Sequence, residues 1–360
     1  MKPRRADAAP IRFGTDGWRA FIADEFTFEN VERVAQAYAD FIKQHRDDEE
    51  SSTRSGKDSS KYGDEDTWKE SRVHPHVVVG YDRRFLSEQF AERAAEVLAG
   101  NDITVSLFDT DVPTPLVSWA VRERGAAGGV CITASHNPPH FNGFKIKAPW
   151  GGSATPETTV AVESLVDASA PQRAALLRDA RGGLSTEVES YRRQVAGYVD
   201  LELIRANGAR VVVDPMHGSG GRWVESFLSG GRLRAETIRA ERDTLFGGVS
   251  PEPIDRNLAP LKERVVERRA LVGLATDGDA DRVGAVNERG ETLTMHEVVP
   301  LLLLHLILSV SSPQAHRRGA RPSSLRDAHR LQVRRRPHAA RGHSHRGRRV
   351  GRRRRARAHT

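Results

Sequence analysis

Signals for helices and strands alternate along most of the chain, and this alternation constrains the fold more than any other feature. Apolar residues recur with helical spacing over residues 28–44, 87–98 and 188–204. Short runs rich in branched apolar residues, typical of buried strands, cover residues 76–81, 103–108 and 210–214. The sequence therefore predicts layered α/β domains in which helices pack on sheets.

A serine stands at the end of a further predicted strand, in the segment Thr133-Ala134-Ser135-His136-Asn137-Pro138-Pro139. The apolar run before it, Gly129–Ile132, is typical of a buried strand, and the two prolines prevent its continuation. Ser135 is thus expected on a tight loop at the strand's carboxyl end. The next strand, Phe141–Lys147, is expected to bring Lys145 back near this loop. A serine is a weak nucleophile unless a base, a cation or a metal lies beside it.

A second predicted strand, Leu271–Thr276, is followed directly by Asp277-Gly278-Asp279-Ala280-Asp281-Arg282. Carboxylates at alternate positions, separated by small residues, can turn their oxygens toward one point. That arrangement suits a hard cation such as Mg²⁺. A helix-flanked calcium loop is the competing interpretation, with Glu288 at its twelfth position. Arg282 argues against it, because that loop requires glycine there.

Together these segments resemble those of the α-D-phosphohexomutases, the phosphoglucomutase/phosphomannomutase family. Further matching motifs are Phe13–Arg19, Val79–Arg84 and Asp214–Gly218, and the resemblance covers roughly residues 11–310. It implies three-layer α/β/α domains with mixed sheets, two of them complete and a third only begun.

The resemblance also implies roles for individual residues. Ser135 would carry a phosphoryl group, and Asp277, Asp279 and Asp281 would hold Mg²⁺ against it. Lys145 and Arg19 match positions credited with proton transfer and charge stabilisation. His136 is interpreted as a residue that shapes the loop or contacts phosphate, although it could serve as a base. Asn137 and Arg282 are candidate phosphate contacts.

The implied reaction interconverts hexose 1-phosphate and hexose 6-phosphate, of glucose or mannose, with a hexose 1,6-bisphosphate as intermediate and activator. The expected partner is therefore a hexose phosphate. The sequence does not select one sugar, nor does it indicate an oligomeric state.

The domain boundaries are expected near residues 160 and 292. Residues 1–160 form the first domain, with a charged insertion at about 47–70 that is predicted to be disordered. Residues 161–292 form the second domain and residues 293–313 begin a third. The polar stretch 151–169 marks the first boundary, and a capping box at Thr294–Glu297 opens the last helix.

Composition favours a cytoplasmic protein that does not bind membranes. The single cysteine, Cys131, excludes an internal disulfide and fits a reducing compartment. The start of the chain lacks the apolar core of a signal peptide. The longest apolar run, residues 298–310, is too short to cross a bilayer.

Residues 314–360 differ from the rest of the chain. They contain 17 arginines, one acid and no lysine, so this tail carries a formal charge of +16 whereas the whole chain carries +8. A back-translation of residues 325–339 and 344–352, read one base over, resembles the family's third domain and its sugar-recognition loop. We therefore interpret the tail as a disordered, out-of-frame segment, with a frameshift between Ser309 and Leu325.

The sequence leaves two other interpretations open. The chain could be a non-catalytic remnant that keeps only the phosphoserine and metal sites. Alternatively, the arginine-rich tail could bind nucleic acid through its phosphates. The tail has no aromatic residue on which bases could stack, so no specific nucleic-acid partner is expected.

Overall fold

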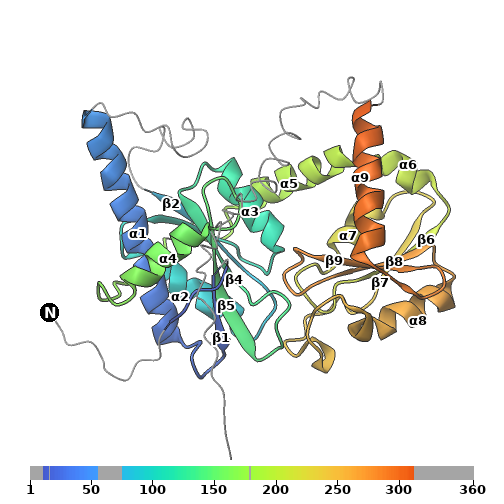
Figure 1. Cartoon of the computed structure of the whole chain (residues 1–360), viewed down its shortest axis with the longest axis horizontal. Coiled ribbons are helices and arrows are strands. Elements are labelled where there is room, and N and C mark those ends of the chain that lie inside the picture. Colours follow the sequence, from blue (N-terminus) through green and yellow to red (C-terminus); the bar gives the residue numbers. More distant parts are fainter. Residues whose placement is uncertain (1–10, 16, 56–74, 178–179, 312–360) are drawn as a thin grey trace, which may run out of the picture. The chain divides into compact units, whose positions relative to one another are not determined.

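The computed structural model describes residues 11–15, 17–55, 75–177 and 180–311 (Figure 1). Both sheets of the protein belong to one compact unit that ends at Val298. The architecture is mixed α/β, as the alternation of signals predicts. The insertion beyond residue 55 and the tail from residue 312 lie outside the described residues, so the disorder and the frameshift expected there stay predictions.

The first sheet has five strands in the order β1-β5-β4-β2-β3. Three of them, β2, β3 and β4, are parallel, whereas β5 runs antiparallel to both β4 and β1. The strands are β1 (Gly17–Phe21), β2 (His76–Tyr81), β3 (Thr104–Leu107), β4 (Gly128–Ile132) and β5 (Phe141–Lys147).

Helices cover both faces of this sheet (Figure 1). Side chains alternate between the faces along each strand, so Val77 and Val79 of β2 join one core and Val78 joins the other. The first core is closed by α1 (Phe28–Ser55), α2 (Ser87–Ala99) and α4 (Pro156–Leu165), and the second by α3 (Thr114–Glu123) and α5 (Ser185–Tyr198).

The second sheet repeats this plan with the order β10-β9-β8-β6-β7. Its strands are β6 (Arg210–Asp214), β7 (Arg234–Thr237), β8 (Val272–Thr276), β9 (Val283–Asn287) and β10 (Thr292–Leu293). Val212 packs against α8 (Ala259–Arg268) on one face. Val211 and Val213 pack on the other face, where α6 (Leu201–Ala206) and α7 (Trp223–Leu228) lie.

The two predicted functional loops occupy the same connection in the two sheets. In the first sheet β2 lies between its parallel neighbours β3 and β4, and β4 is followed by the antiparallel strand β5. In the second sheet β6 lies between β7 and β8, and β8 is followed by the antiparallel strand β9. The β4–β5 connection carries Ser135, and the β8–β9 connection carries the three aspartates. Both loops therefore begin at the carboxyl end of a strand, where α/β folds commonly place their ligands.

The structure differs from the sequence expectations in three elements. The helix predicted over residues 188–204 is two helices, α5 and α6. The side chain of Asp200 accepts a hydrogen bond from the Leu203 amide and so starts a new helix. Helix α1 continues to Ser55, into the segment predicted to be disordered.

Helix α4 lies across the boundary expected near residue 160 and completes the layer over the first sheet. Val162 belongs to that core, and Glu163 accepts a hydrogen bond from the Phe13 amide at 2.7 Å. Thr155 begins the helix, since its hydroxyl accepts a hydrogen bond from the Thr158 amide. The polar stretch 151–169 is therefore partly a helix of the first domain.

The apolar run near residue 300 forms α9 (Met295–Ser311). The predicted capping box is present at its start, where the Glu297 carboxylate accepts a hydrogen bond from the Thr294 amide at 2.7 Å. Whether α9 opens a third domain stays a prediction. In the part of the chain that the structure describes, no helix is both long and apolar enough to cross a membrane.

Candidate active site

The loop after β4 holds Ser135 in an unusual backbone conformation. Ser135 is buried and has a φ of 54°, in the left-handed region that non-glycine residues seldom adopt. Its amide donates a hydrogen bond to the Thr133 hydroxyl at 2.8 Å. The Asn137 amide donates to the Ala134 carbonyl at 3.0 Å and closes the turn. The loop therefore fixes the direction of the serine side chain.

The serine hydroxyl points at the aspartate loop, which is the β8–β9 connection Asp277–Arg282. Ser135 Oγ donates a hydrogen bond to Asp277 Oδ2 at 2.8 Å. One ligand atom each from Asp277, Asp279 and Asp281 lies within 4.8 Å of the others. The amides of Asp281 and Arg282 both donate to Asp277 Oδ1 at 3.1 Å, so the loop wraps around that carboxylate. The structure thus brings the predicted nucleophile and the predicted metal ligands together.

Gly278 allows this approach. A Cβ atom at this position would lie 2.5 Å from the carbonyl oxygen of Ser135, which is closer than any real side chain can come. The Gly278 amide donates to the Pro251 carbonyl at 3.2 Å, and its own carbonyl accepts from the Ser219 amide at 3.0 Å. The two loops meet backbone to backbone because glycine stands at the point of contact.

Lys145 lies on β5 and pairs with two of the aspartates. Its Nζ lies 2.9 Å from Asp279 Oδ2 and 3.3 Å from Asp281 Oδ2. Asp279 Oδ2 also accepts a hydrogen bond from the Thr114 hydroxyl at 2.8 Å. Thr114 begins α3, and its amide donates to the Asp279 carbonyl at 2.9 Å. Sequence reasoning missed Thr114, whose only signal was the proline after it at a helix start.

The three carboxylates do not share the same electrostatic environment. Burial, reinforced by the negative charges of Asp279 and Asp281, raises the pKa of Asp277 above its ordinary value. Burial acts in the same direction on the pKa of Asp279, but the charge of Lys145 and the hydrogen bonds from Lys145, Thr114 and Ser135 together outweigh it. They hold the pKa of Asp279 below its ordinary value. The site therefore concentrates negative charge that one lysine only partly balances.

The residues present fit a divalent cation. Asp279 Oδ1 is buried and has no hydrogen-bond partner among the described residues. A buried carboxylate oxygen without a partner is costly, and a bound cation would remove that cost. Carboxylate oxygens from alternate residues are also the ligands that Mg²⁺ prefers.

An arginine-lined pocket lies next to the serine loop. It has a volume of about 830 Å³, and its lining includes Arg12, Arg19 and Arg282. Arg19 donates to the Asn137 side-chain oxygen at 3.4 Å, and Arg282 Nη1 lies 2.8 Å from His136 Nδ1. The predicted catalytic residue Arg19 and the candidate phosphate contact Arg282 thus line the pocket, and each contacts a residue of the serine loop. Burial and the neighbouring Arg282 charge lower the pKa of His136, which favours the neutral imidazole.

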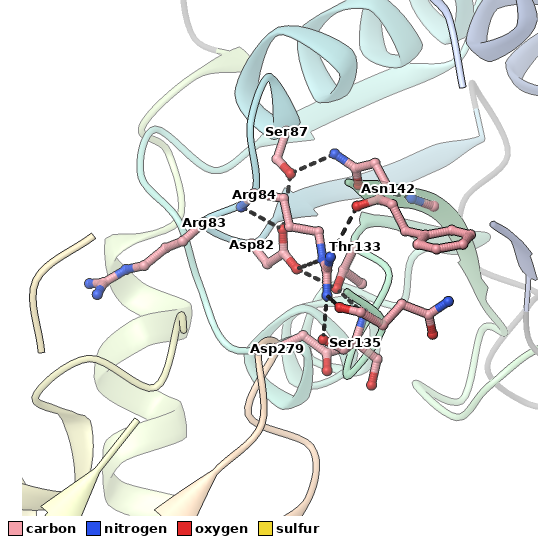
Figure 2. Close-up of polar contacts among 12 residues, drawn as sticks. Asp82, Arg83, Arg84, Ser87, Thr133, Ser135, Asn142 and Asp279 are labelled. Carbon is pink, nitrogen blue, oxygen red and sulfur yellow. Dashed lines mark hydrogen bonds and ion pairs between the residues drawn. The ribbon is translucent and has the colours of Figure 1, made fainter. Parts of the chain in front are cut away.

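Behind the loop lies a buried network that the sequence did not reveal as functional (Figure 2). Asp82 follows β2 and accepts hydrogen bonds from the Thr133 hydroxyl at 2.6 Å and the Ser87 hydroxyl at 2.9 Å. Arg84 lies beside Asp82 with its side chain fully buried. The segment Val79–Arg84 matches a motif of the family, but nothing in its pattern shows that Arg84 turns inward.

Comparison with known proteins now identifies the family. Residues 65–173 match the domain described as "Phosphoglucomutase/phosphomannomutase, alpha/beta/alpha domain I", and residues 189–290 match the corresponding domain II. The chain belongs to the α-D-phosphohexomutase family. Both site loops of this phosphohexomutase, and strands β2 to β9, lie within the matched residues, whereas β1 and β10 lie outside them.

Relatives and solved structures agree with this assignment. The chain is 31% identical over 281 residues to a phosphoglucomutase/phosphomannomutase of Thermococcus kodakarensis, covering 77% of this chain and 55% of that one. It is 31% identical over 287 residues to a phosphoglucosamine mutase of Levilactobacillus brevis, covering 77% and 56%. The crystal structure of a "putative phosphomannomutase" from Thermus thermophilus has a TM-score of 0.71 at 35% identity, covering 84% and 62%. The chain spans about half the length of these curated relatives.

Proposed function

We propose that this phosphohexomutase chain transfers a phosphoryl group between Ser135 and a hexose phosphate, as the half-reaction of hexose 1-phosphate and 6-phosphate interconversion. The observation that carries the proposal is the contact between Ser135 Oγ and Asp277 Oδ2 at 2.8 Å. It joins a serine on a rigid loop to a cluster of carboxylates that fits a cation. Phosphoryl transfer needs this combination of positioning and charge neutralisation.

In the transfer from a hexose 1,6-bisphosphate, a bond forms between Ser135 Oγ and phosphorus, and the phosphorus–oxygen bond to the sugar breaks. The serine proton leaves Oγ, and the sugar oxygen gains a proton. Asp277 Oδ2 accepts the hydrogen bond from Oγ and so orients the attacking oxygen. The charge of Lys145, whose Nζ lies 2.9 Å from Asp279 Oδ2, would stabilise the equatorial phosphoryl oxygens. Arg19 and Arg282 would bind phosphate in the adjoining pocket.

Mg²⁺ would be held by Asp277, Asp279 and Asp281. When bound, it would neutralise charge on the transferring group and polarise it for attack. We expect Mg²⁺ to raise the thermal unfolding temperature of the chain, because binding to the folded state alone stabilises it. Asp279→Asn should abolish that increase, and EDTA should reverse it in the unaltered chain. A chain whose unfolding temperature ignores Mg²⁺ would contradict this assignment.

The substrate belongs to the hexose or hexosamine phosphates. Relatives are named for phosphoglucosamine, phosphoglucose and phosphomannose chemistry, and the chain matches them at similar identity. We favour glucose or mannose phosphates, with hexose 1,6-bisphosphate as the activator. Rates of labelling with the bisphosphates of glucose, mannose and glucosamine would rank the three sugars directly.

The test of the half-reaction is uptake of a phosphoryl group. Incubation with ³²P-labelled glucose 1,6-bisphosphate and Mg²⁺ should label the chain, and mass spectrometry should locate the phosphate on Ser135. Ser135→Ala should abolish labelling. Ser164→Ala is the matched control, because Ser164 lies on α4 and its exposed hydroxyl donates to the Ala161 carbonyl within the same helix. Labelling that survives in Ser135→Ala would refute the proposal.

The same experiment separates the alternatives. A non-catalytic remnant would bind Mg²⁺ but take up no phosphate at Ser135. The nucleic-acid hypothesis depends on residues 314–360, which lie outside the described residues. It predicts binding of RNA that is lost when the tail is removed, while labelling at Ser135 is unchanged.

A further inference from the structure

The buried side chain of Arg84 donates hydrogen bonds to Asp82 and to the serine loop. Its Nε donates to Asp82 Oδ2 at 3.1 Å. The two terminal nitrogens donate to four backbone carbonyls of the loop, those of Ser135 at 2.7 Å, Asn137 at 2.8 Å, Pro138 at 2.8 Å and Phe141 at 3.0 Å. An arginine has five N–H donors, so the guanidinium is saturated by one carboxylate and four carbonyls.

We infer that Arg84 is a positioning residue, which holds the Ser135 loop in the one conformation that presents Oγ to Asp277. The inference rests on the proposed function of Ser135. Four carbonyls that converge on one cation must point inward, so the backbone from Ser135 to Phe141 is curled around the guanidinium (Figure 2). That curl contains the left-handed φ of 54° at Ser135, which has an intrinsic energetic cost and persists only if its surroundings impose it.

A second chain of contacts leads from the same network to the serine amide. Asp82 Oδ2 accepts from both Arg84 Nε and the Thr133 hydroxyl. The Thr133 hydroxyl in turn accepts from the Ser135 amide at 2.8 Å. The Ser135 peptide is thus held on both sides, at its amide through Asp82 and at its carbonyl by Arg84 directly. Rotation of this residue would break contacts on both sides together.

Residues between β7 and α8 of the second sheet also contact Arg84. The Arg84 guanidinium carbon lies 5.1 Å from the centre of the Phe246 ring, which is itself buried. Arg242 donates to the carbonyls of Arg83 and Arg84, each at 3.3 Å. The residue that anchors the serine loop therefore also contacts the connection between β7 and α8.

Lysine cannot replace this arginine, because an ammonium group has three donors and no planar fork. In Arg84→Lys we expect the maximum rate of Ser135 labelling by glucose 1,6-bisphosphate to fall about 10- to 100-fold. The bisphosphate concentration for half-maximal rate should change by less than about twofold, since the pocket arginines are untouched. Arg93→Lys is the matched control, because Arg93 of α2 pairs with Glu32 of α1 and with Glu96, away from the serine loop.

A purely structural role predicts something else: lower stability with normal labelling by the folded fraction. Guanidinium rescue tests this difference. In Arg84→Ala, millimolar guanidinium chloride should restore labelling, and equal sodium chloride should not. A folded Arg84→Lys that labels at the rate of the unaltered chain overturns the inference. So does an Arg84→Ala that stays unfolded with guanidinium present, since Arg84 would then serve folding alone.

A crystal structure of Arg84→Lys provides a readout that does not depend on labelling. We expect Ser135 to leave the left-handed region and Oγ to move away from Asp277. An unchanged loop overturns the inference even if the unaltered chain takes up no phosphate. Absence of labelling in the unaltered chain, by contrast, refutes the proposed function, so the two failures are distinguishable.

Discussion

Cys131 illustrates how strongly a single residue's environment can suppress its chemistry. It lies on β4, four residues before Ser135, fully buried and in contact with the Thr114 hydroxyl at 3.2 Å. Burial raises the pKa of its thiol to about 12. We expect no reaction with Ellman's reagent or iodoacetamide in the folded chain, and one thiol per chain after unfolding. Rapid modification of the native protein would show that the sheet opens.

His76 makes stability depend on pH. It begins β2 and contacts the Ser106 hydroxyl at 2.9 Å. Burial, aided by the nearby Arg124 charge and opposed by Glu187, lowers its pKa to about 4. The unfolded chain therefore binds a proton that the folded chain does not between about pH 6.5 and pH 4, and stability falls as pH falls through that range. Urea unfolding should show a shallower loss in His76→Gln. An identical pH slope in both proteins would contradict the prediction.

At the scale of elements, the contact between the two loops depends on Gly278. Gly278→Ala would force the added methyl group against the Ser135 carbonyl, at a cost of about 1–3 kcal/mol if the loops stay docked. We expect the loops to separate instead, with labelling at Ser135 reduced about tenfold or more and little change in the helices. Circular dichroism and the labelling assay measure the two effects.

Gly208→Ala is the matched control for that substitution. It lies between α6 and β6, and an added Cβ would meet no atom within 4 Å. It should label normally. Normal labelling by Gly278→Ala would show that the backbone contact between the loops is not needed for transfer.

The elements also show what the sequence could predict and what it could not. Strand β6 and helix α2 carry clear apolar periods and were predicted almost to the residue, because local pattern and tertiary burial agree there. Strand β1 was not predicted. Its segment, Gly17–Phe21, includes the polar Arg19 and becomes a strand only by pairing with β5. Tertiary pairing of this kind leaves no periodic signal in five residues.

The site likewise contains residues that the sequence predicted and residues that it did not. Ser135 and the three aspartates stand in distinctive local strings, so their residue types and spacing suggested the chemistry. Thr114 and Arg84 act from distant segments, 165 and 51 residues from the side chain or carbonyl that they bind. Their function depends on which way a side chain turns after the sheet has formed, and a single sequence does not record that direction.

At the scale of the whole molecule, the half-reaction and the complete cycle should separate. The chain spans about half the length of its curated relatives, and the arginine-lined pocket of the described residues lies next to the serine loop. Complete interconversion requires the bisphosphate to turn over without escaping, which needs binding energy at its far end. We expect uptake at Ser135 to be much faster than net conversion of glucose 1-phosphate to glucose 6-phosphate, measured with a coupled dehydrogenase.

A fusion supplies the control for that prediction. Adding the unmatched C-terminal part of the Thermococcus kodakarensis relative should raise net conversion about tenfold or more and leave uptake at Ser135 nearly unchanged. If the chain alone converts the sugars as fast as it takes up phosphate, the prediction is wrong, and turnover needs no additional contacts to the far end of the bisphosphate.

The serine loop and the aspartate loop are corresponding connections, β4–β5 and β8–β9, in two sheets of similar strand order. Neither loop contributes its polar residues to a hydrophobic core. Foldability and reactivity are therefore separable traits in this protein. A library that randomises the segment after β8 should yield many well-folded, inert variants, and a screen for solubility would pass nearly all of them. A screen for phosphate uptake at Ser135 would instead select the variants in which the two loops still meet.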